Sequence, residues 1–461
     1  ANDWSSMEYN AFGDVVRVGV NGVWQQQNQY DLAGRIWASN SGDGIWKYFG
    51  YDKNGNQTLL ITSAGANLSG KTMAQAFALI SGTDVNATYT IYDKRNLAIS
   101  AVEEGRQLSA SGTSTLNSGR TYNAFGEVAS ETNAAGVTTA YTYNTMGKMI
   151  RSEGPTVSIT LENGAAVWVR PAQDFYYDQS GRLVATRDAN GTYGTNGTGT
   201  NGATKAANTG NLNRLTLLAG TGYGGGNALV TVETHADGGT VTTAYDIYGN
   251  ARKITQSVGD GTSIITEQGF DKLGRLTQVT NPGGLVDYYA YDVLGQRVAH
   301  WNNFLASTNK ELTGYDVQGR ITYQRAWGGT SGDETIISYV WSGTLITPGL
   351  ATGSAAFGGW TQTTTYANGK TLVEKNDLFG RLTEKTDLGG NTTAYTYDLA
   401  GRLVSALTGA YGTTYTYYNT GQYKQVSSFS RWYNGNTANN VETRGEYTYD
   451  VLGRRLTELD T

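Results

Sequence analysis

The sequence predicts an all-β protein built from one repeated antiparallel β-hairpin of about 21 residues, wound into a long coiled strip. Two observations predict this fold. A short phrase recurs along the chain, in which an aromatic residue precedes Asp or Asn, two variable residues, Gly and often Arg. The chain contains 62 Gly and 32 Tyr but only 4 Pro, a composition that suits turns and strands. Repeats decide the architecture because each unit buries its apolar face only against its neighbours.

The phrase recurs at a regular spacing except where insertions separate its copies. It reads Tyr30-Asp31-Leu32-Ala33-Gly34-Arg35 near the start, and six intervals between successive copies are 21 residues long. Degenerate copies begin at Tyr92, which lacks Gly in place, and at Tyr418, which is one residue short. Clear copies begin at Tyr9, Tyr30, Tyr51, Tyr122, Tyr143, Tyr177, Tyr245, Phe270, Tyr291, Tyr315, Asn376, Tyr397 and Tyr449.

The unit that starts at Asp377 shows why the phrase predicts a hairpin. Residues 377–380 form one turn and residues 387–390 a second, which leaves strands at 381–386 and 391–397. Asp suits the first turn position because its carboxylate accepts hydrogen bonds from nearby backbone N–H groups. Gly then takes the positive-φ position that closes the hairpin.

The repeated Asp, Gly and Arg are therefore predicted to be structural turn residues and not members of a catalytic site. We expect the Arg side chains to stack on Tyr or to pair with turn carboxylates of adjacent units. The predicted turn residues are Asp31, Gly34, Arg35, Asp178, Gly181, Arg182, Asp271, Gly274, Arg275, Asp316, Gly319, Arg320, Asp377, Gly380, Arg381, Asp398, Gly401, Arg402, Asp450, Gly453 and Arg454.

The repeat overrides the usual relation between length and domain number and predicts one continuous strip over residues 1–461. Insertions interrupt it at about 57–91, 149–175, 188–240 and 325–372. The first contains the only convincing short helix, from Lys71 to Ile80, and the second contains an alternating stretch that predicts a strand pair. The chain stops as the second turn of a unit begins, at Asp460, so we expect it to be a piece of a longer protein.

The repeated phrase resembles the YD repeat of the Rhs family, which includes bacterial Rhs proteins, the B and C components of ABC toxin complexes, wall-associated YD-repeat proteins and the teneurins. The resemblance covers nearly all of the chain outside the insertions. It implies a β-strip wound into a hollow shell or barrel-like spiral, in which bacterial members hold a toxic polypeptide. It also implies a secreted or cell-surface bacterial protein, with toxin-delivery or secretion components as partners.

One property of the family does not transfer to this sequence. Bacterial shells of the family usually end in a core with Asp-Pro motifs, where an aspartate-dependent self-cleavage frees the cargo. Pro155, Pro171, Pro282 and Pro348 are the only prolines here, and none follows Asp. Self-cleavage is therefore not carried over to this chain.

Composition excludes several kinds of partner. A net charge of −5 without any run of Lys or Arg argues against nucleic acid. The absence of Cys removes disulfides, thiolate metal sites and Cys nucleophiles. The most apolar short run, from Met73 to Ile80, is too short to span a bilayer.

Catalytic and cofactor motifs are also lacking, so no enzyme activity, metal or cofactor is predicted. The two histidines, His235 and His300, have no partner at helical or hairpin spacing and are expected to be ordinary residues. Two Gly-x-Gly-x-x-Gly matches, at 197–202 and 220–225, lack the following helix that a phosphate site needs.

Two hypotheses of function remain, besides a less favoured enzyme on a β-scaffold. In the first, the strip is a shell segment that encloses a toxin or another cargo polypeptide. In the second, it is a cell-surface adhesion or carbohydrate-binding scaffold, because ten Trp exceed what the repeat requires. Trp341 and Trp360 in the last insertion are the predicted ligand-contact aromatics, with Trp360 expected in a loop.

Overall fold

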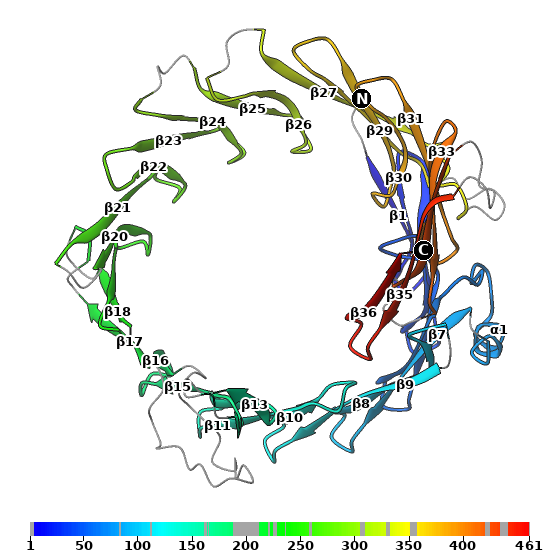
Figure 1. Ribbon diagram of the computed structural model, residues 1–461, viewed down its shortest axis with the longest axis horizontal. Coiled ribbons are helices and arrows are strands. Elements are labelled where there is room, and N and C mark those ends of the chain that lie inside the picture. The colour runs from blue at the N-terminus through cyan, green and yellow to red at the C-terminus, as the bar shows by residue number, and fades with distance from the viewer. Residues whose placement is uncertain are drawn as a thin grey trace. The chain divides into compact units, whose positions relative to one another are not determined.

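The computed structural model describes residues 4–82, 84–110, 113–160, 164, 166–187, 212–219, 222–224, 228–235, 237–257, 261–304, 309–328, 332–350, 357–419, 425–433 and 441–460 (Figure 1). The predicted all-β class is confirmed, since the described residues form 36 strands and one short helix. The insertion at 188–240 lies partly outside the described residues, as does the Gly-x-Gly-x-x-Gly match at 220–225, and the match at 197–202 lies wholly outside them.

The strands up to the middle of the chain have the following bounds: β1 (Ser5–Tyr9), β2 (Val15–Val20), β3 (Val23–Tyr30), β4 (Ile36–Ser39), β5 (Lys47–Tyr51), β6 (Gln57–Ser63), β7 (Val85–Tyr92), β8 (Ala98–Gln107), β9 (Thr113–Tyr122), β10 (Val128–Thr132), β11 (Thr138–Tyr143), β12 (Met149–Glu153), β13 (Val157–Thr160), β14 (Ala166–Val169), β15 (Ala172–Tyr177), β16 (Leu183–Arg187), β17 (Leu212–Ala219) and β18 (Leu229–Thr234).

The remaining strands are β19 (Thr240–Tyr245), β20 (Ala251–Ser257), β21 (Ser263–Phe270), β22 (Leu276–Thr280), β23 (Val286–Tyr291), β24 (Arg297–Asn302), β25 (Glu311–Tyr315), β26 (Ile321–Arg325), β27 (Glu334–Ser342), β28 (Gly359–Thr365), β29 (Thr371–Asp377), β30 (Leu382–Thr386), β31 (Thr392–Tyr397), β32 (Leu403–Thr408), β33 (Tyr411–Tyr417), β34 (Val426–Tyr433), β35 (Val441–Tyr449) and β36 (Arg455–Asp460).

Each strand pairs antiparallel with the strand that follows it in the chain, as successive hairpins require. The pairs β22–β23, β23–β24 and β30–β31 show this pattern. The hairpin β13–β14 is the exception, because it forms a separate sheet while β12 pairs directly with β15. The other 34 described strands belong to one sheet.

Because consecutive strands run antiparallel, the two kinds of turn lie at opposite ends of the strands. The turn of the repeated phrase follows the aromatic residue, and we call its side of the strip the repeat-turn edge. The intervening turns, such as residues 387–390, form the second-turn edge. A β-bulge marks the repeated aromatic residue, for example between Thr396 and Tyr397, and increases the local twist of the hairpin.

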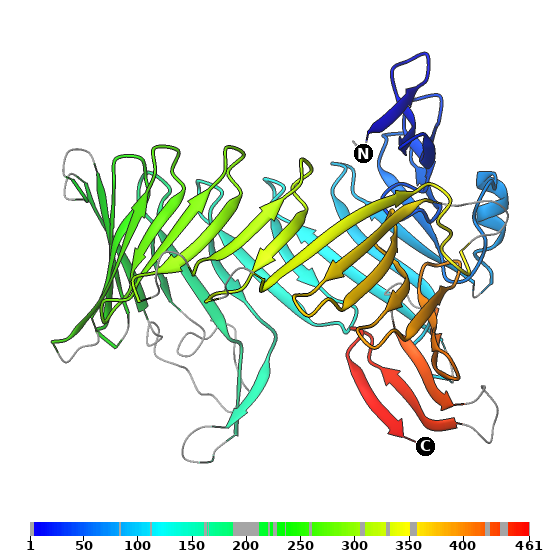
Figure 2. The ribbon, with the colours of Figure 1, turned by 90° about the horizontal axis from the view of Figure 1, so that it is seen from above.

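The chain divides into two compact units. Unit 1 consists of residues 1–120, 132–136 and 337–461, and unit 2 of residues 121–131 and 137–336. In unit 2, consecutive hairpins place their turns in rows along the strip (Figure 2).

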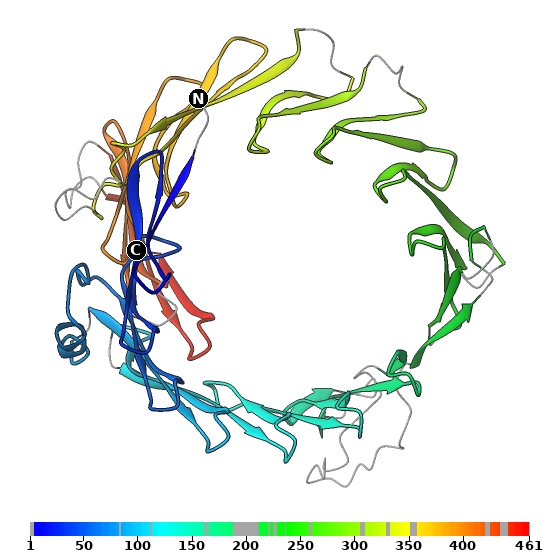
Figure 3. The same cartoon turned by 180° about the vertical axis from the view of Figure 1, so that it is seen from behind.

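Unit 1 contains two strips that are distant in sequence. We call residues 4–120 the N-terminal strip and residues 337–460 the C-terminal strip. Hydrogen bonds join them, for example from Arg402 to the carbonyl of Ala64, and Figure 3 shows both from behind.

A small hydrophobic core lies in the N-terminal strip beneath the predicted helix. Helix α1 (Met73–Ala78) is capped at its N-terminus by Thr72. The Thr72 hydroxyl accepts the backbone N–H of Gln75, and the Gln75 side-chain oxygen accepts the backbone N–H of Thr72. Its residue Ala76 packs with Tyr48 and Ile61 of the sheet. The first insertion therefore covers one face of the strip.

The other insertions add strands. The second holds the hairpin β13–β14, which agrees with the strand pair predicted there. The last holds β27 and β28, so Trp360 lies on a strand and the prediction of a loop is wrong. Within the described residues, no helix is both long enough and apolar enough to cross a membrane.

Candidate functional site

The turn at Asp271 shows the geometry of the repeat. One carboxylate oxygen of Asp271 accepts the backbone N–H groups of Leu273 and Arg275, each at 2.9 Å. The other accepts Nε of Arg275 at 2.7 Å. Gly274, with φ of 77°, donates its N–H to the Asp271 carbonyl at 3.0 Å. One Asp carboxylate thus accepts hydrogen bonds from both the backbone and the Arg side chain of its own turn.

These bonds favour the ionised form of Asp271. The backbone N–H of Arg275 and then its side chain keep the pKa of Asp271 below its usual value, despite partial desolvation. The same causes lower the pKa of Asp178 and Asp450. For Asp31, the side-chain bond from Arg35 is the largest cause of the lowered pKa.

A second set of contacts joins each turn to the next repeat. The guanidinium of Arg275 lies over the ring of Tyr291 at 5.0 Å, and its NH1 donates to the Asp292 carbonyl at 2.9 Å. The Tyr291 hydroxyl donates back to the carbonyl of Leu276 at 2.7 Å. We call this arrangement of Asp, Arg and the following Tyr the repeat clasp.

The clasp recurs along the chain. Arg35 lies over Tyr51 at 4.7 Å, and the Tyr51 hydroxyl donates to the Ile36 carbonyl. Arg402 lies over Tyr417 at 4.7 Å. Burial of the Tyr417 phenol beside Asp398 raises its pKa to about 12, so this hydroxyl keeps its proton. All seven predicted arginines donate Nε to the Asp of their own turn, at 2.6–2.8 Å: Arg35, Arg182, Arg275, Arg320, Arg381, Arg402 and Arg454.

This geometry corrects one expectation about the arginines. They pair with the carboxylate of their own turn and not with that of the adjacent unit. The reason is that residues four apart face each other across the turn, whereas the next unit presents a ring and a carbonyl oxygen. The expected stacking on Tyr is present at Arg35, Arg275 and Arg402.

The degenerate turn at Asp93 forms without glycine. Asn96 takes the glycine position with φ of 62° and donates its N–H to the Asp93 carbonyl at 3.0 Å. Asn is one of the few residues that adopts this conformation readily. Its side-chain oxygen accepts from Asn54 and Asn56 of the preceding repeat turn, which holds Asn96 in place.

In unit 1 the same arginines also join the two strips. NH1 of Arg381 donates to the carbonyl of Asp43 at 2.6 Å, and NH2 of Arg402 donates to that of Ala64 at 2.9 Å. Each donor is 338 residues from its acceptor, so the two strips meet with matched 21-residue spacing. The repeat-turn edge of the C-terminal strip therefore docks on the second-turn edge of the N-terminal strip.

A polar cluster continues this junction at the degenerate turn of Tyr418. Asn419 accepts the N–H of Gln107 at 2.9 Å, and its carbonyl accepts from the buried guanidinium of Arg106 at 3.2 Å. Arg106 also bonds Asn86 and pairs with Glu103 at 3.1 Å. Sequence reasoning missed Arg106, because it lies outside the repeated phrase.

The predicted ligand-contact aromatics lie together. The rings of Trp341 and Trp360 meet edge to face, with centroids 5.0 Å apart. A Cβ atom at Gly358 would lie 2.6 Å from the Trp341 ring, so the pair packs closely over the glycine. Both rings remain partly accessible.

His300 lies on strand β24, as an ordinary strand histidine would, and it has two carboxylate partners that its sequence spacing did not indicate. Its Nδ1 lies 3.1 Å from Glu311 and its Nε2 lies 3.2 Å from Asp287, on the neighbouring strands β25 and β23. Cross-strand pairing brings these residues together, and helical or hairpin-turn spacing does not reveal it. The two carboxylates face opposite sides of the ring, so the three side chains do not converge on one point.

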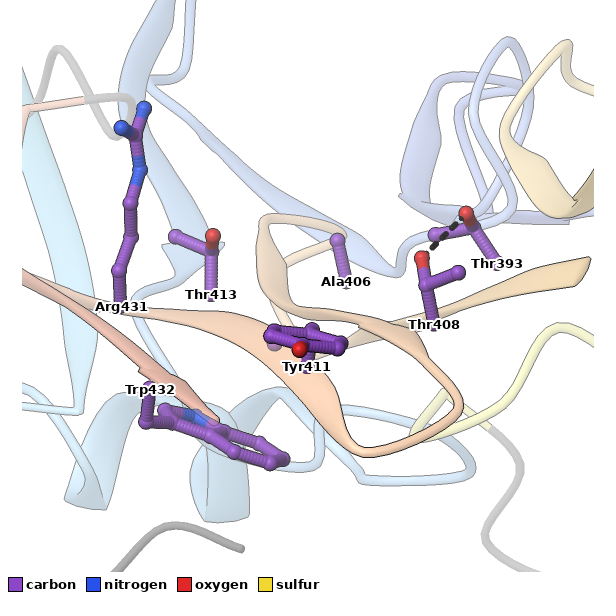
Figure 4. Close-up of a pocket in the computed structure, with 8 residues that line it drawn as sticks. Thr393, Ala406, Thr408, Tyr411, Thr413, Arg431 and Trp432 are labelled. Atoms are coloured by element: carbon purple, nitrogen blue, oxygen red, sulfur yellow. Dashed lines mark hydrogen bonds between the residues drawn. The ribbon is translucent and has the colours of Figure 1, made fainter. Parts of the chain in front are cut away.

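A shallow pocket of about 260 Å³ opens beside β33, on the C-terminal strip (Figure 4). Tyr411 is 62% exposed at its rim, and Trp432 lies against Gly412, where a Cβ atom would be 2.5 Å from the indole ring. The hydroxyls of Thr393 and Thr408 are joined by a 2.6 Å hydrogen bond. The pocket therefore combines aromatic faces with hydroxyl groups.

Comparison with known proteins agrees with the repeat. The family described as RHS Repeat matches residues 122–156, 270–300 and 377–414. The predicted resemblance to the Rhs/YD-repeat family is confirmed. No curated protein matches the chain.

Solved structures of toxin complexes share the fold. TcdB2-TccC3-TEV aligns with a TM-score of 0.55 and 16% identity over 100% of this chain and 24% of that chain. TcdB2-TccC3 aligns at 0.54 and 16% over 99% and 25%. The Photorhabdus luminescens Tc holotoxin pore aligns at 0.53 and 15% over 100% and 23%. The chain thus spans about a quarter of the length of these structures.

Proposed function

Since the chain carries RHS repeats and shares the fold of these toxin-complex structures, we propose that it is a scaffold segment of a secreted bacterial shell that encloses a cargo polypeptide. The cargo is a toxin or another polypeptide of the same protein. The role is mechanical and not enzymatic. Toxin-delivery or secretion components would be its further partners.

The observation that carries the proposal is the combination of clasp and docking contacts. Where the arginine stacks on the following Tyr, the clasp ties one hairpin to the next along the strip, as Arg275 and Tyr291 do. The contacts of Arg381 and Arg402 tie one strip to another across their edges. A container needs stiffness in both of these directions, and unpaired edges would otherwise invite other chains.

The absence of Cys allows a direct test of enclosure. Ile264 and Ile265 are consecutive residues of β21, so their side chains point to opposite faces of the sheet, and both are exposed. In the native protein, Ile264→Cys and Ile265→Cys should both react with a small maleimide, whereas a maleimide on a long polymer should label only one of them. Equal labelling of both positions by the polymer would contradict an enclosed face.

A carbohydrate-binding scaffold at the cell surface is the second candidate, and the pocket at Tyr411 favours it. An exposed aromatic face next to threonine hydroxyls suits a sugar ring, which has an apolar face and polar edges. Glycan-array binding should be lost in Tyr411→Ala and in Trp360→Ala if each aromatic contacts sugar. Binding that is unchanged in both variants, or absent from the original protein, would remove this candidate.

A further inference from the structure

The sheet has two faces, and the repeated aromatic residue marks one of them. Successive side chains of a strand point to opposite faces, so residues two apart share a face. We call the face that carries the repeated aromatic residues, such as Tyr291 and Tyr397, the clasp face, and the opposite one the reverse face. Directly paired residues lie on the same side of a sheet, so each face keeps its identity from strand to strand.

A second aromatic residue lies on the clasp face of several strands, two residues before the repeated one. In β23, for example, Tyr289 precedes the repeated Tyr291. The clasp uses the later ring, whereas the earlier ring is left partly exposed. We call these earlier residues the inner row: Tyr141, Phe175, Tyr289, Tyr395, Tyr415 and Tyr447.

The inner-row rings show which chemistry they accept. The guanidinium of Arg297 lies over the ring of Tyr289 at 5.8 Å, and that of Arg455 lies over Tyr447 at 5.1 Å. An aromatic face attracts cations, and it also packs against apolar side chains. The inner row therefore suits a partner that presents Arg, Lys and apolar side chains.

The chain itself covers part of the reverse face. Tyr48 stands three residues before the repeated Tyr51, so it lies on the reverse face, as does its cross-strand partner Ile61. Both belong to the small core in which Ala76 of helix α1 is buried. The first insertion thus excludes other chains from the reverse face of the N-terminal strip at this place.

In unit 2 the clasp face carries carboxylates that no basic residue neutralises. Glu233 on β18 is exposed, and Asp287 and Glu311 flank His300. Within the described residues, neither Lys nor Arg forms an ion pair with any of these three carboxylates. The clasp face of unit 2 therefore favours a basic partner by charge complementarity.

The reverse face of unit 2 differs, because its carboxylates have basic partners on neighbouring strands. Nε of Arg151 lies 2.9 Å from Asp174, and Nζ of Lys253 lies 3.3 Å from Glu267. These residues alternate with the clasp-face residues of the same strands. The reverse face thus offers less charge to a basic partner than the clasp face does.

We propose that the clasp face is the side of the wall that meets the cargo, and that it binds extended basic segments of the cargo polypeptide. Arg, Lys and apolar side chains of these segments lie on the inner-row rings, and the clasp-face carboxylates attract their charge. Tyr suits this task because it supplies a large, rigid contact area at a low cost in side-chain entropy. The inference rests on the proposed enclosure, and it adds which face meets the cargo and what chemistry that face recognises.

Labelling of adjacent cysteines tests which face is enclosed. Ile264 stands six residues before the repeated Phe270, so it lies on the clasp face, and Ile265 lies on the reverse face. In the native protein, a maleimide on a long polymer should label Ile264→Cys about tenfold or more slowly than Ile265→Cys, because an enclosed site is reached only when the wall opens. The opposite preference would overturn this inference and leave enclosure standing, whereas equal labelling would overturn both.

Photo-crosslinking tests contact between the inner row and the cargo. Tyr288 and Tyr289 are adjacent in β23, point to opposite faces and are both partly exposed. Each stacks on a ring of β24, Tyr288 on Trp301 at 5.5 Å and Tyr289 on His300 at 4.9 Å, so they form a matched pair. Benzoylphenylalanine in place of Tyr289 should crosslink to basic peptides of the cargo in the native protein, and in place of Tyr288 it should not. Crosslinks from Tyr288, or from neither position, would overturn the inference.

Charge neutralisation tests the preference for basic segments without any cargo. The intact chain should bind a fluorescent peptide of alternating Gly and Arg more tightly than one of alternating Gly and Glu. Glu233→Gln with Glu311→Gln on the clasp face should lower the affinity for the basic peptide by about threefold or more at low salt. Glu267→Gln with Glu334→Gln removes two charges from the reverse face and should leave the affinity unchanged. Equal losses in the two variants, or no preference for the basic peptide, would overturn the inference even if the wall encloses cargo.

Discussion

Replacing Arg402 by Met removes one side chain that belongs to both the clasp and the strip junction. The methionine keeps most of the apolar stem and loses the guanidinium. Arg402 is only 8% exposed and donates to Asp398 at 2.6 Å, to the Tyr418 carbonyl at 3.2 Å and to the Ala64 carbonyl at 2.9 Å. The substitution therefore leaves three acceptors without this donor.

The expected loss follows from those contacts. A hydrogen bond that involves a charged group contributes about 1.5–3 kcal/mol. Breaking a buried ion pair by removing one partner costs about 3–5 kcal/mol. Since these terms overlap and Asp398 retains some access to water, we expect the free energy of unfolding of unit 1 to fall by about 3–5 kcal/mol.

Arg454→Met is the matched control. Arg454 makes the same bond to its own turn, with Nε 2.7 Å from Asp450, but its side chain is 74% exposed. An exposed ion pair contributes about 0–1 kcal/mol, so this variant should remain close to the original stability.

Urea unfolding, followed by tryptophan fluorescence, measures both variants. Hydrogen exchange adds a local measure, because Ala64 and Ala66 donate their N–H groups to the Asp84 carbonyl next to the junction. Exchange at these amides should accelerate in Arg402→Met and not in Arg454→Met. Equal destabilisation by the two substitutions would refute the assignment of Arg402 to the junction.

Three further predictions concern the turns and the clasp. In a urea titration, Asn96→Ala should lower the free energy of unfolding by about 1–2 kcal/mol, because Ala adopts positive φ poorly. Asn96→Gly should lower it by less, and equal losses of stability in the two variants would argue against backbone strain. The pKa of Asp271 is lowered in the folded state, so its contribution to stability is fully present above the ordinary value of 3.8 and is lost as pH falls through the lower folded value. The free energy of unfolding measured against pH should therefore decline in that acidic range, and less steeply in Asp271→Asn. An unchanged slope in Asp271→Asn would contradict this role of the carboxylate. The pKa of Tyr417 is raised from 10.0 to about 12, so its contribution to stability is present below pH 10 and is lost as pH rises through 12. Tyr417→Phe should lower the free energy of unfolding by about 1 kcal/mol at neutral pH, because the hydrogen bond to the Leu403 carbonyl is lost, and should flatten the alkaline decline. Spectroscopic unfolding measured against pH that shows the same alkaline slope in Tyr417→Phe would disprove this role of the phenol.

Much of the fold could be predicted because the repeat encodes it locally. Asp, Gly and Arg lie within five residues, and turn chemistry alone assigns their places. The strands predicted at 381–386 and 391–397 agree closely with β30 and β31. Asn96 required one more step, since the phrase has Gly at this position and Asn is one of the few residues that can replace it at positive φ.

The contacts between distant residues could not be predicted in this way. Asp43 and Arg381 are 338 residues apart, and their meeting depends on how the strips pack, which no local pattern expresses. His300 meets Asp287 and Glu311 because neighbouring strands pair in a particular register, and a single sequence leaves that register open. The second-turn glycines predicted turns, but nothing in the sequence indicated that the rings of Phe357 and Phe379 lie against Gly44.

Enclosure of cargo is the central claim, and a cryo-electron microscopy map of the native protein that contains these residues tests it most directly. The account predicts a closed wall of hairpins with weak density inside it, in which Arg381 and Arg402 join neighbouring strips. An open strip, or a solenoid filled by its own side chains, would contradict enclosure.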